Sequence, residues 1–386
     1  MTWFCAKQFF DGTNLKTNYR FQVKDGVVTS TESDQGSNGG GLNDQGSNDF
    51  LCPDVQFNGL VTPGFLDAQV NGGGGVLLNQ APSVVTLKTM FSAHQQFGTT
   101  SMLPTLITDN LSVMQNAADA IAQAKSENIE GVVGVHFEGP HLSVAKRGIH
   151  PSDQVRAITD AELKVITRND LGKVLLTVAP ENVSPDVIKD LVSQGVIVAL
   201  GHSNADFNTV LAAIDAGATG VTHLFNAMSG LQARAPGLIG AALDDERITA
   251  GLIVDLLHVH ETNCRLAFKA KSAKGVMLVT DAMAHVGSDL MSLPWLDSTI
   301  TRVGDKLTTP DGTLAGSCLD MMAAVRNSQQ VLGIPLEDVL HSATQVPAKF
   351  LGLNDIGHLN VGAKADFLVI NDNMQIEQVY QSGRLI

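Results

Sequence analysis

The sequence predicts an α/β protein, in which a TIM-like (β/α)8 barrel carries a small β-sandwich domain formed from both termini. Three observations predict this architecture. The central part of the chain repeats short apolar runs that are separated by segments of helical spacing. The two ends show short strand patterns and turn signals instead. Polar residues follow several of the apolar runs, at the point where a barrel places its active site.

The predicted barrel strands are apolar throughout instead of alternating with polar residues. Such runs are typical of strands that are buried on both faces of a parallel sheet. Helical spacing between them is clearest over 111–125, 186–194 and 208–216. Eight strand–helix units of this kind close into a barrel. The eight runs are 60–69, 99–105, 132–138, 174–179, 196–202, 219–223, 249–255 and 276–281.

The two chain ends are each too small to fold alone. Residues 21–28 have the pattern strand, turn, strand, with Asp25-Gly26 as the hairpin signal. Short strands return after Pro347, over 365–370 and again from Gln378. We therefore expect the ends to pair into one β-domain. The expected bounds are 1–62 with 352–386 for this domain, and 63–351 for the barrel.

A low-complexity stretch, 33–49, contains Asp-Gln-Gly-Ser-Asn twice, at 34–38 and 44–48. Two copies this short predict a surface loop, to which we assign no function. The formal net charge is −14, and no Lys/Arg cluster is longer than Lys146-Arg147. This balance argues against a nucleic-acid partner.

The predicted location is the cytoplasm. The four cysteines form no CxxC pair, so neither a zinc knuckle nor a disulfide framework is expected, and a reduced compartment is the natural interpretation. The N-terminus lacks the basic and apolar regions of a signal peptide. No apolar stretch approaches the roughly 18 residues of a membrane helix, so no membrane partner is expected.

Three residues of metal-ligating types end predicted strands: Glu138 ends the third strand, and His202 and His223 end the adjacent fifth and sixth strands. Alone, Glu138 could cap a helix, and a single histidine is more often a packed core or surface group. Together the three residues form a Glu/His/His set. Three protein ligands plus water are characteristic of an open catalytic site for zinc or a similar divalent ion.

Two further residues lie at or near the ends of predicted strands. Asp281 ends the eighth strand, where it can take a proton from an activated water and return it to a leaving amine. The alternative is a helix N-cap before Ala282. His136 shares a strand face with Glu138, because side chains two residues apart point the same way. We expect it to lie deeper and to be packed.

Motifs spread over the predicted barrel resemble the amidohydrolase superfamily, and the N-acetylglucosamine-6-phosphate deacetylases in particular. The resemblance implies hydrolysis of that sugar phosphate to glucosamine 6-phosphate and acetate by a metal-activated water, with Asp281 as general base and acid. It covers almost the whole barrel in the right order, whereas the N-terminal strands are less similar. The matching segments are 63–72, 136–140, 201–205, 222–228, 278–282 and 314–317.

The end of strand one sharpens this resemblance. Most amidohydrolases carry His-x-His there, and the binuclear ones often use a carboxylated lysine from strand four. Here strand one ends in Gln69-Val-Asn71, and strand four continues into Ala179-Pro-Glu181, with no lysine. The pattern is similar to the one-metal deacetylases, in which Gln-x-Asn replaces the histidine pair. Gln69 and Asn71 are then expected to support the metal ligands or to be weak ligands themselves.

The resemblance also implies substrate contacts. His150 and His258 match histidines that touch the sugar, and Asn226 with Ala227 matches a segment whose backbone meets the phosphate. Arg234 matches a phosphate-binding arginine, which fits the affinity of guanidinium groups for phosphate. For each of these residues a solvated surface position is the alternative. A loop containing Gly312, Leu314 and Gly316-Ser317 is expected to close over the N-acetyl group.

The resemblance implies one divalent ion per subunit, with zinc first and iron, cobalt, manganese or nickel as alternatives. It also implies a homodimer in which Arg234 reaches the neighbouring site. Two other functions stay open from the residues alone. One is a hydrolase of cyclic amides or nucleobases, which the missing His-x-His disfavours. The other is a non-catalytic sugar-phosphate-binding protein, which would not need Glu138, His202, His223 or Asp281.

Overall fold

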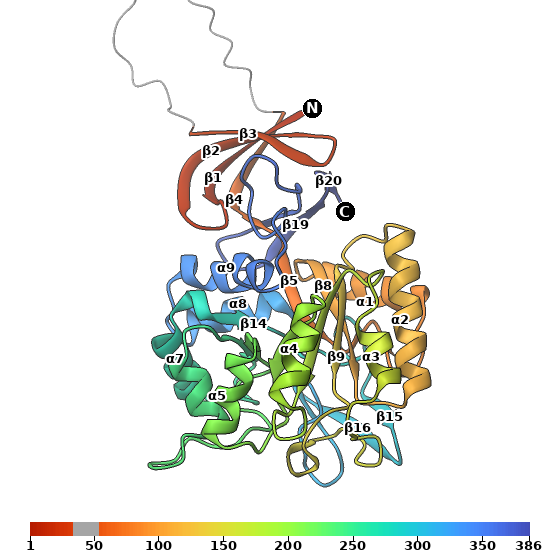
Figure 1. The fold of residues 1–386 in the computed structure, drawn as a ribbon. Helices are drawn as coiled ribbons and strands as arrows, with labels where there is room; N and C mark the ends of the chain where they lie inside the picture. Colours follow the sequence, from red (N-terminus) through yellow and green to blue (C-terminus); the bar gives the residue numbers. More distant parts are fainter. Residues whose placement is uncertain (34–53) are drawn as a thin grey trace, which may run out of the picture.

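The computed structural model describes residues 1–33 and 54–386. The low-complexity stretch therefore lies outside the described residues, except for Ser33. The molecule has two parts, which Figure 1 shows stacked one above the other, with both termini in the upper part. No helix in the described ranges is both long enough and apolar enough to cross a membrane.

The lower part is the predicted barrel. Its eight parallel strands follow one another around the sheet in chain order, and Val70 bridges Ala282 to bring the first strand back to the last. All eight runs contain a barrel strand, and the α/β barrel prediction is confirmed. The strands are β5 (Phe65–Val70), β8 (Thr99–Ile107), β9 (Gly134–Glu138), β10 (Lys173–Val178), β11 (Ile197–Leu200), β12 (Gly220–Val221), β13 (Thr249–Leu252) and β14 (Val276–Leu278).

Helices pack around the outside of this barrel (Figure 1). Their starts are set by side-chain caps: Ser184, Asp206 and Asp320 each accept a hydrogen bond from a backbone N–H of the helix that follows. The three helices predicted by spacing are present as α2, α4 and α5. The helices are α1 (Val84–Gln95), α2 (Leu111–Ser126), α3 (Asp160–Ile166), α4 (Pro185–Ser193), α5 (Phe207–Asp215), α6 (Gly237–Asp244), α7 (Glu261–Lys271), α8 (Met321–Gln330), α9 (Leu336–Ala343) and α10 (Gln345–Phe350).

The prediction that the first apolar run, 60–69, forms a single strand is wrong. Its first part belongs to β4 (Val55–Pro63) in the upper sheet, and only β5 belongs to the barrel. The chain changes sheets at Gly64. A side chain there would collide with Thr100, since a Cβ atom would lie 1.9 Å from the Thr100 hydroxyl oxygen. The close approach of two chain segments therefore requires glycine at this junction.

The upper part is one seven-stranded sheet that both chain ends build. Aromatic side chains meet inside it; the rings of Phe4 and Phe21 both pack edge-on against Phe367. The predicted Asp25-Gly26 hairpin turn is present, with both residues at positive φ, as a two-residue hairpin requires. The strand order is β20 (Arg384–Leu385), β19 (Ile376–Gln381), β18 (Phe367–Ile370), β4, β1 (Thr2–Phe10), β2 (Leu15–Lys24) and β3 (Val27–Ser33).

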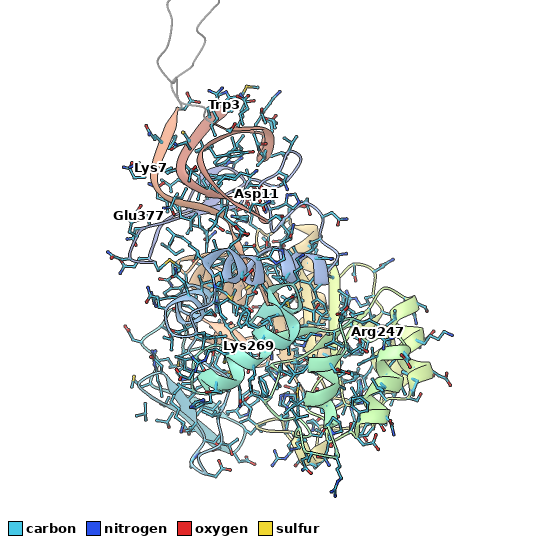
Figure 2. The ribbon with its side chains drawn as sticks, turned by 90° about the vertical axis from the view of Figure 1, so that its left-hand side faces the viewer. Trp3, Lys7, Asp11, Arg247, Lys269 and Glu377 are labelled. Atoms are coloured by element: carbon cyan, nitrogen blue, oxygen red, sulfur yellow. The ribbon has the colours of Figure 1, made fainter. Side chains whose placement is uncertain are left out.

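A small three-stranded sheet was not predicted from the sequence. It consists of β15 (Ser292–Trp295), β16 (Ser298–Val303) and β17 (Lys306–Thr308). It lies at the end of the barrel opposite the terminal sheet, where the barrel strands finish (Figure 1). Trp295 anchors it, since its indole N–H donates to the Ile149 carbonyl at 3.2 Å. Figure 2 marks Trp3, Lys7 and Asp11 on the terminal domain and Arg247 and Lys269 on the barrel.

Candidate active site

The candidate site lies where the barrel strands end. Glu138 is the last residue of β9, while His202, His223 and Asp281 follow β11, β12 and β14 by two or three residues. The last three have positive φ angles of 46°, 34° and 53°. Left-handed backbone is uncommon outside glycine, and it concentrates at functional sites where surrounding structure holds it in place.

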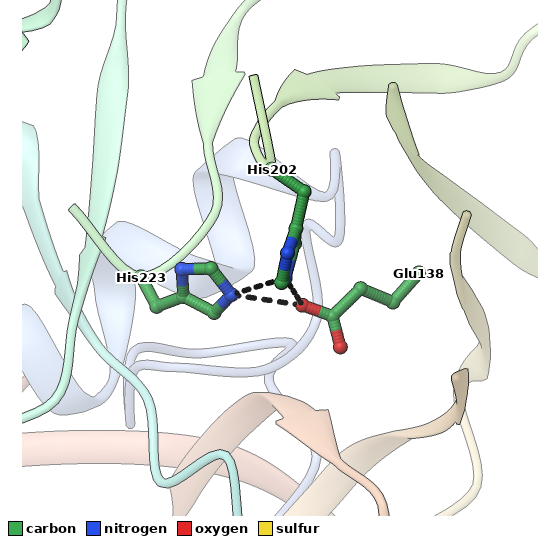
Figure 3. A group of neighbouring side chains, drawn as sticks. All are labelled: Glu138, His202 and His223. Atoms are coloured by element: carbon green, nitrogen blue, oxygen red, sulfur yellow. Dashed lines mark hydrogen bonds and ion pairs between the residues drawn. The ribbon is translucent and has the colours of Figure 1, made fainter. Parts of the chain in front are cut away.

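Glu138, His202 and His223 converge on one point (Figure 3). The Glu138 Oε1 atom lies 3.2 Å from His202 Nε2 and 2.9 Å from His223 Nε2, and the two nitrogens are 3.0 Å apart. Ligands at ~2.0–2.2 Å from a tetrahedral zinc ion would be separated by about 3.4 Å. The three buried donors therefore have the chemistry and the spacing to hold a metal ion.

The orientation of His202 fits a metal ligand. Its Nδ1 lies 2.8 Å from the Lys146 carbonyl oxygen, so Nδ1 carries the proton and Nε2 is left with a free electron pair. Burial opposes ionisation of Glu138, but its contacts with the two imidazoles outweigh burial and hold its pKa well below the ordinary value. The set thus offers two imidazole nitrogens and one carboxylate oxygen as donors.

Asp281 lies next to this set, and side-chain amides at the end of the first barrel strand, β5, donate hydrogen bonds to it. The Gln69 Nε2 group donates to Glu138 Oε1 at 3.0 Å and to Asp281 Oδ1 at 3.1 Å. The Asn71 Nδ2 group donates to the same Asp281 oxygen at 2.7 Å. Burial and the nearby Glu138 raise the pKa of Asp281 to about 6. At neutral pH the carboxylate is therefore ionised but close to its protonation point, as suits a proton-transferring group.

His136 lies below the site, inside the barrel. Its ring nitrogens contact the hydroxyl groups of Thr105 and Thr177, at 3.4 and 2.7 Å. Only 1% of its surface is exposed. It is packed, as expected from its position two residues before Glu138.

A cavity of about 380 Å³ opens above the metal-ligand set. His150 lies in its wall, and its Nδ1 is 2.8 Å from the Thr108 hydroxyl oxygen. Burial, together with the nearby His202, lowers the pKa of His150 well below its ordinary value, so its imidazole is neutral. The structure thus brings five of the six predicted substrate contacts to one cavity with the metal-ligand set and Asp281. The five are His150, Asn226, Ala227, His258 and Leu314.

Arg234 is the sixth predicted contact, and this chain does not bring it to the cavity. It is exposed in the loop between β12 and α6, which projects from the barrel at the lower left of Figure 1. Two polar residues in the cavity wall were missed, Lys146 and Thr313. Lys146 stands in the basic pair of the sequence, four residues before His150, but nothing in that pattern indicated its carbonyl contact with His202.

Comparisons with known proteins identify the family of this chain. The amidohydrolase family model matches residues 60–386. An N-acetylgalactosamine-6-phosphate deacetylase from Shewanella sp. (strain ANA-3) is 44% identical over 97% of this chain and 93% of its own length. An N-acetylglucosamine-6-phosphate deacetylase from Haemophilus influenzae is 34% identical over 86% of this chain and 87% of its own length.

Solved structures give the same result. The N-acetylglucosamine-6-phosphate deacetylase from Pasteurella multocida superposes with a TM-score of 0.91 at 32% identity, over 100% of this chain and 99% of that one. A mutant of the Mycobacterium smegmatis enzyme, solved in complex with N-acetyl-D-glucosamine-6-phosphate, gives 0.90 at 27% identity, over 100% and 98%. The resemblance that the motifs carry is thus confirmed. This chain belongs to the amidohydrolase family.

Proposed function

We propose that this protein hydrolyses the acetamide of N-acetylglucosamine 6-phosphate to give glucosamine 6-phosphate and acetate. One observation carries the proposal. A buried Glu/His/His set and an aspartate with a raised pKa share one cavity, in a chain whose similar relatives are named as deacetylases of N-acetylated amino-sugar 6-phosphates.

Glu138, His202 and His223 are the residues that would hold the metal, with one ion per subunit. Zinc is our first choice, because a tetrahedral site with two imidazoles and one carboxylate suits it, while iron, cobalt, manganese and nickel accept similar donors. When bound, such an ion lowers the pKa of a water towards ~7 and polarises a carbonyl oxygen. Gln69 supports the set by a hydrogen bond to Glu138, and Asn71 donates a hydrogen bond to the neighbouring Asp281.

Asp281 is the proposed general base and acid. Its ionised carboxylate takes a proton from the water that attacks the acetamide carbon. It then gives that proton to the amine nitrogen as the carbon–nitrogen bond breaks. The second proton of the water stays on the carboxyl product, so the products are acetic acid and the amine, which at neutral pH become acetate and the ammonium form of the sugar. The neutral His150 imidazole lies in the same cavity, where it can donate a hydrogen bond to the carbonyl oxygen.

The remaining cavity residues are proposed to bind the sugar. His258 contacts the sugar ring, the backbone of Asn226 and Ala227 meets the phosphate, and Leu314 covers the acetyl group, as the resemblance implies. Each of these residues lines the cavity. Arg234 supplies the phosphate clamp from a neighbouring subunit, so the active unit is a homodimer. Its exposed position outside its own cavity supports a role in trans.

The galacto epimer is a second candidate substrate. The Shewanella relative, at 44% identity, is named as an N-acetylgalactosamine-6-phosphate deacetylase. Incubation of the zinc-loaded protein with each 6-phosphate, while released acetate is measured, tests both proposals. A kcat/KM at least ten times higher for the gluco compound would support our choice, and the reverse ratio would favour the epimer. No acetate from either would refute deacetylation and leave the cyclic-amide and non-catalytic alternatives.

Two further proposals concern the whole chain. The domain bounds remain 1–62 with 352–386 and 63–351, and the terminal sheet and the barrel support this division. We also propose a cytoplasmic location. The free state of Cys264 and Cys318 supports a reducing compartment. Fractionation of the native cells would test it.

A further inference from the structure

A second carboxylate–imidazole pair lies at the barrel mouth, on the turn that follows β13. The Asp255 Oδ2 atom is 2.6 Å from His258 Nδ1. The other oxygen, Oδ1, accepts hydrogen bonds from the backbone N–H groups of Leu257 and His258, at 2.9 and 2.8 Å. Both oxygens of Asp255 are thus engaged, and the side chains of the pair are only 7% and 8% exposed.

This geometry fixes which ring nitrogen of His258 carries a proton. Burial opposes ionisation of Asp255, but the hydrogen bonds from His258 and from the backbone outweigh burial and hold its pKa below the ordinary value. An ionised carboxylate can only accept, so Nδ1 must be the donor. In the neutral imidazole, Nε2 then has a free electron pair and acts as an acceptor.

His258 belongs to the wall of the active-site cavity. His258 lines the active-site cavity together with Asp281, and its charge, when protonated, would lower the pKa of Asp281. The pair is therefore close to the proposed chemistry. Within the described residues, Nε2 makes no hydrogen bond, so it is available to a ligand.

We propose that Asp255 is a positioning residue, which holds His258 in the Nδ1–H tautomer so that Nε2 accepts a hydrogen bond from a hydroxyl group of the substrate. The identity of that substrate rests on the proposed function. Sugar hydroxyl groups are the natural partners, because each can donate to an acceptor that is held in a fixed direction. A site built in this way discriminates strongly against a ligand that cannot make the bond.

Asp255 could instead act only as a cap for the turn, since it accepts two backbone hydrogen bonds. The substitution Asp255→Asn separates these roles. The Asn oxygen can still accept from the backbone, while its NH₂ group then faces His258 Nδ1. Nδ1 must become the acceptor, and the proton moves to Nε2. The turn is kept and the tautomer is reversed.

The test uses the zinc-loaded protein with ¹⁵N-labelled histidine. NMR should show His258 with Nδ1 protonated and Nε2 unprotonated, and this assignment should reverse in Asp255→Asn. The variant should lose about 10- to 100-fold in kcat/KM, the range expected for one hydrogen bond to a buried ionisable group. In a His258→Ala background, Asp255→Asn should change kcat/KM by less than about 2-fold, because a positioning residue acts through its partner.

Asp320→Asn is the matched control. Asp320 also accepts a backbone N–H, from Ala323, but no contact with a histidine is found for it among the described residues. We expect it to leave both the His258 tautomer and kcat/KM unchanged. An Nε2–H tautomer in the unsubstituted protein would overturn the proposal, even if Asp255→Asn failed to fold. An undiminished loss in the His258→Ala background would do the same. Absence of acetate release would refute the proposed function, while the NMR assignment would still decide the tautomer.

Discussion

The Asn71 side chain, directly after β5, donates a hydrogen bond at 2.7 Å to Oδ1 of Asp281, which follows β14. This bond favours the ionised form of Asp281, whereas burial and repulsion from Glu138 favour the protonated form. The Gln-x-Asn pattern at the end of barrel strand β5 therefore affects the pKa of the proposed base, Asp281. It adjusts the pH at which Asp281 can accept a proton.

The first prediction concerns pH. Because Asp281 must be ionised to act as a base, kcat/KM should fall as pH drops through its pKa, at about 6 in the structure. A bound cation should move this acid limb of the pH profile to lower pH. Asn71→Leu removes a donor to the ionised form, so the limb should move to higher pH. A hydrogen bond to a charged group contributes about 1.5–3 kcal/mol, which corresponds to a shift of about one to two pH units. Profiles of kcat/KM from pH 4 to 9 measure it, and a shift to lower pH would contradict this role of Asn71.

The second prediction concerns Asp281 itself. Asp281→Asn keeps the size of the side chain and an oxygen that can accept from Asn71 and Gln69, but it cannot take a proton. We expect kcat to fall by roughly 10²–10⁴-fold. Metal content and the dissociation constant of the sugar phosphate, measured by titration calorimetry, should stay within a few-fold. Near-normal turnover would remove Asp281 from the proposed role.

The third prediction concerns the metal. Elemental analysis of protein freed of adventitious ions should give one divalent ion per chain. Removal by a chelator should abolish acetate release, and added zinc should restore it. Glu138→Gln weakens the set by replacing an anionic donor with a neutral amide, so it should lower the metal content. His358→Gln is the matched control, because the half-buried His358 contacts Asn354 and Asn360, away from the set. Two tightly bound ions per chain would contradict a one-metal site.

Sequence reasoning located the site because barrel topology turns a linear pattern into a spatial one. Glu138, His202 and His223 are far apart in the chain, yet parallel strands bring their ends together. It could not foresee the positive φ angles of His202, His223 and Asp281. Periodicity carries no information on backbone angles after a strand ends.

Other features depended on contacts that no local pattern encodes. The sheet β15–β17 was missed because its strands are short and β15 contains a proline, Pro294. Its stability comes from packing on the barrel mouth, where Trp295 meets Ile149. The first apolar run divides at Gly64, where Thr100 from the next strand leaves no room for a side chain. The proposed role of Asp255 likewise depends on its distance from His258, although the sequence places Asp255 at a strand end.

The fourth prediction concerns Arg234 and the dimer. With a net charge of −14, the protein repels a phosphate at long range and needs a local cation. Arg234 is exposed next to Leu231, which is 60% exposed, in a loop that leaves its own barrel (Figure 1). An exposed apolar side chain and an exposed guanidinium on the same loop suit contact with a second subunit. Arg234→Ala should therefore raise KM for the 6-phosphate by about 10- to 100-fold, the loss expected for a charge-assisted hydrogen bond.

Activity on unphosphorylated N-acetylglucosamine should barely change in Arg234→Ala, because that substrate never makes the contact. Arg247→Ala is the matched control: its side chain is also exposed, on the barrel surface (Figure 2), where it pairs with Asp215 and Asp245. An equal loss for both substrates would exclude the phosphate role. The dimer is tested separately, by light scattering at assay concentration and by mixing Arg234→Ala with Asp281→Asn. Each variant lacks a different part of the shared site, so a mixed dimer has one complete site and one site that lacks both residues. A mixed dimer should therefore have about half of normal activity, and an equal mixture, in which about half of the dimers are mixed, should regain about a quarter. A fully active monomer would refute the shared site and leave the phosphate role standing.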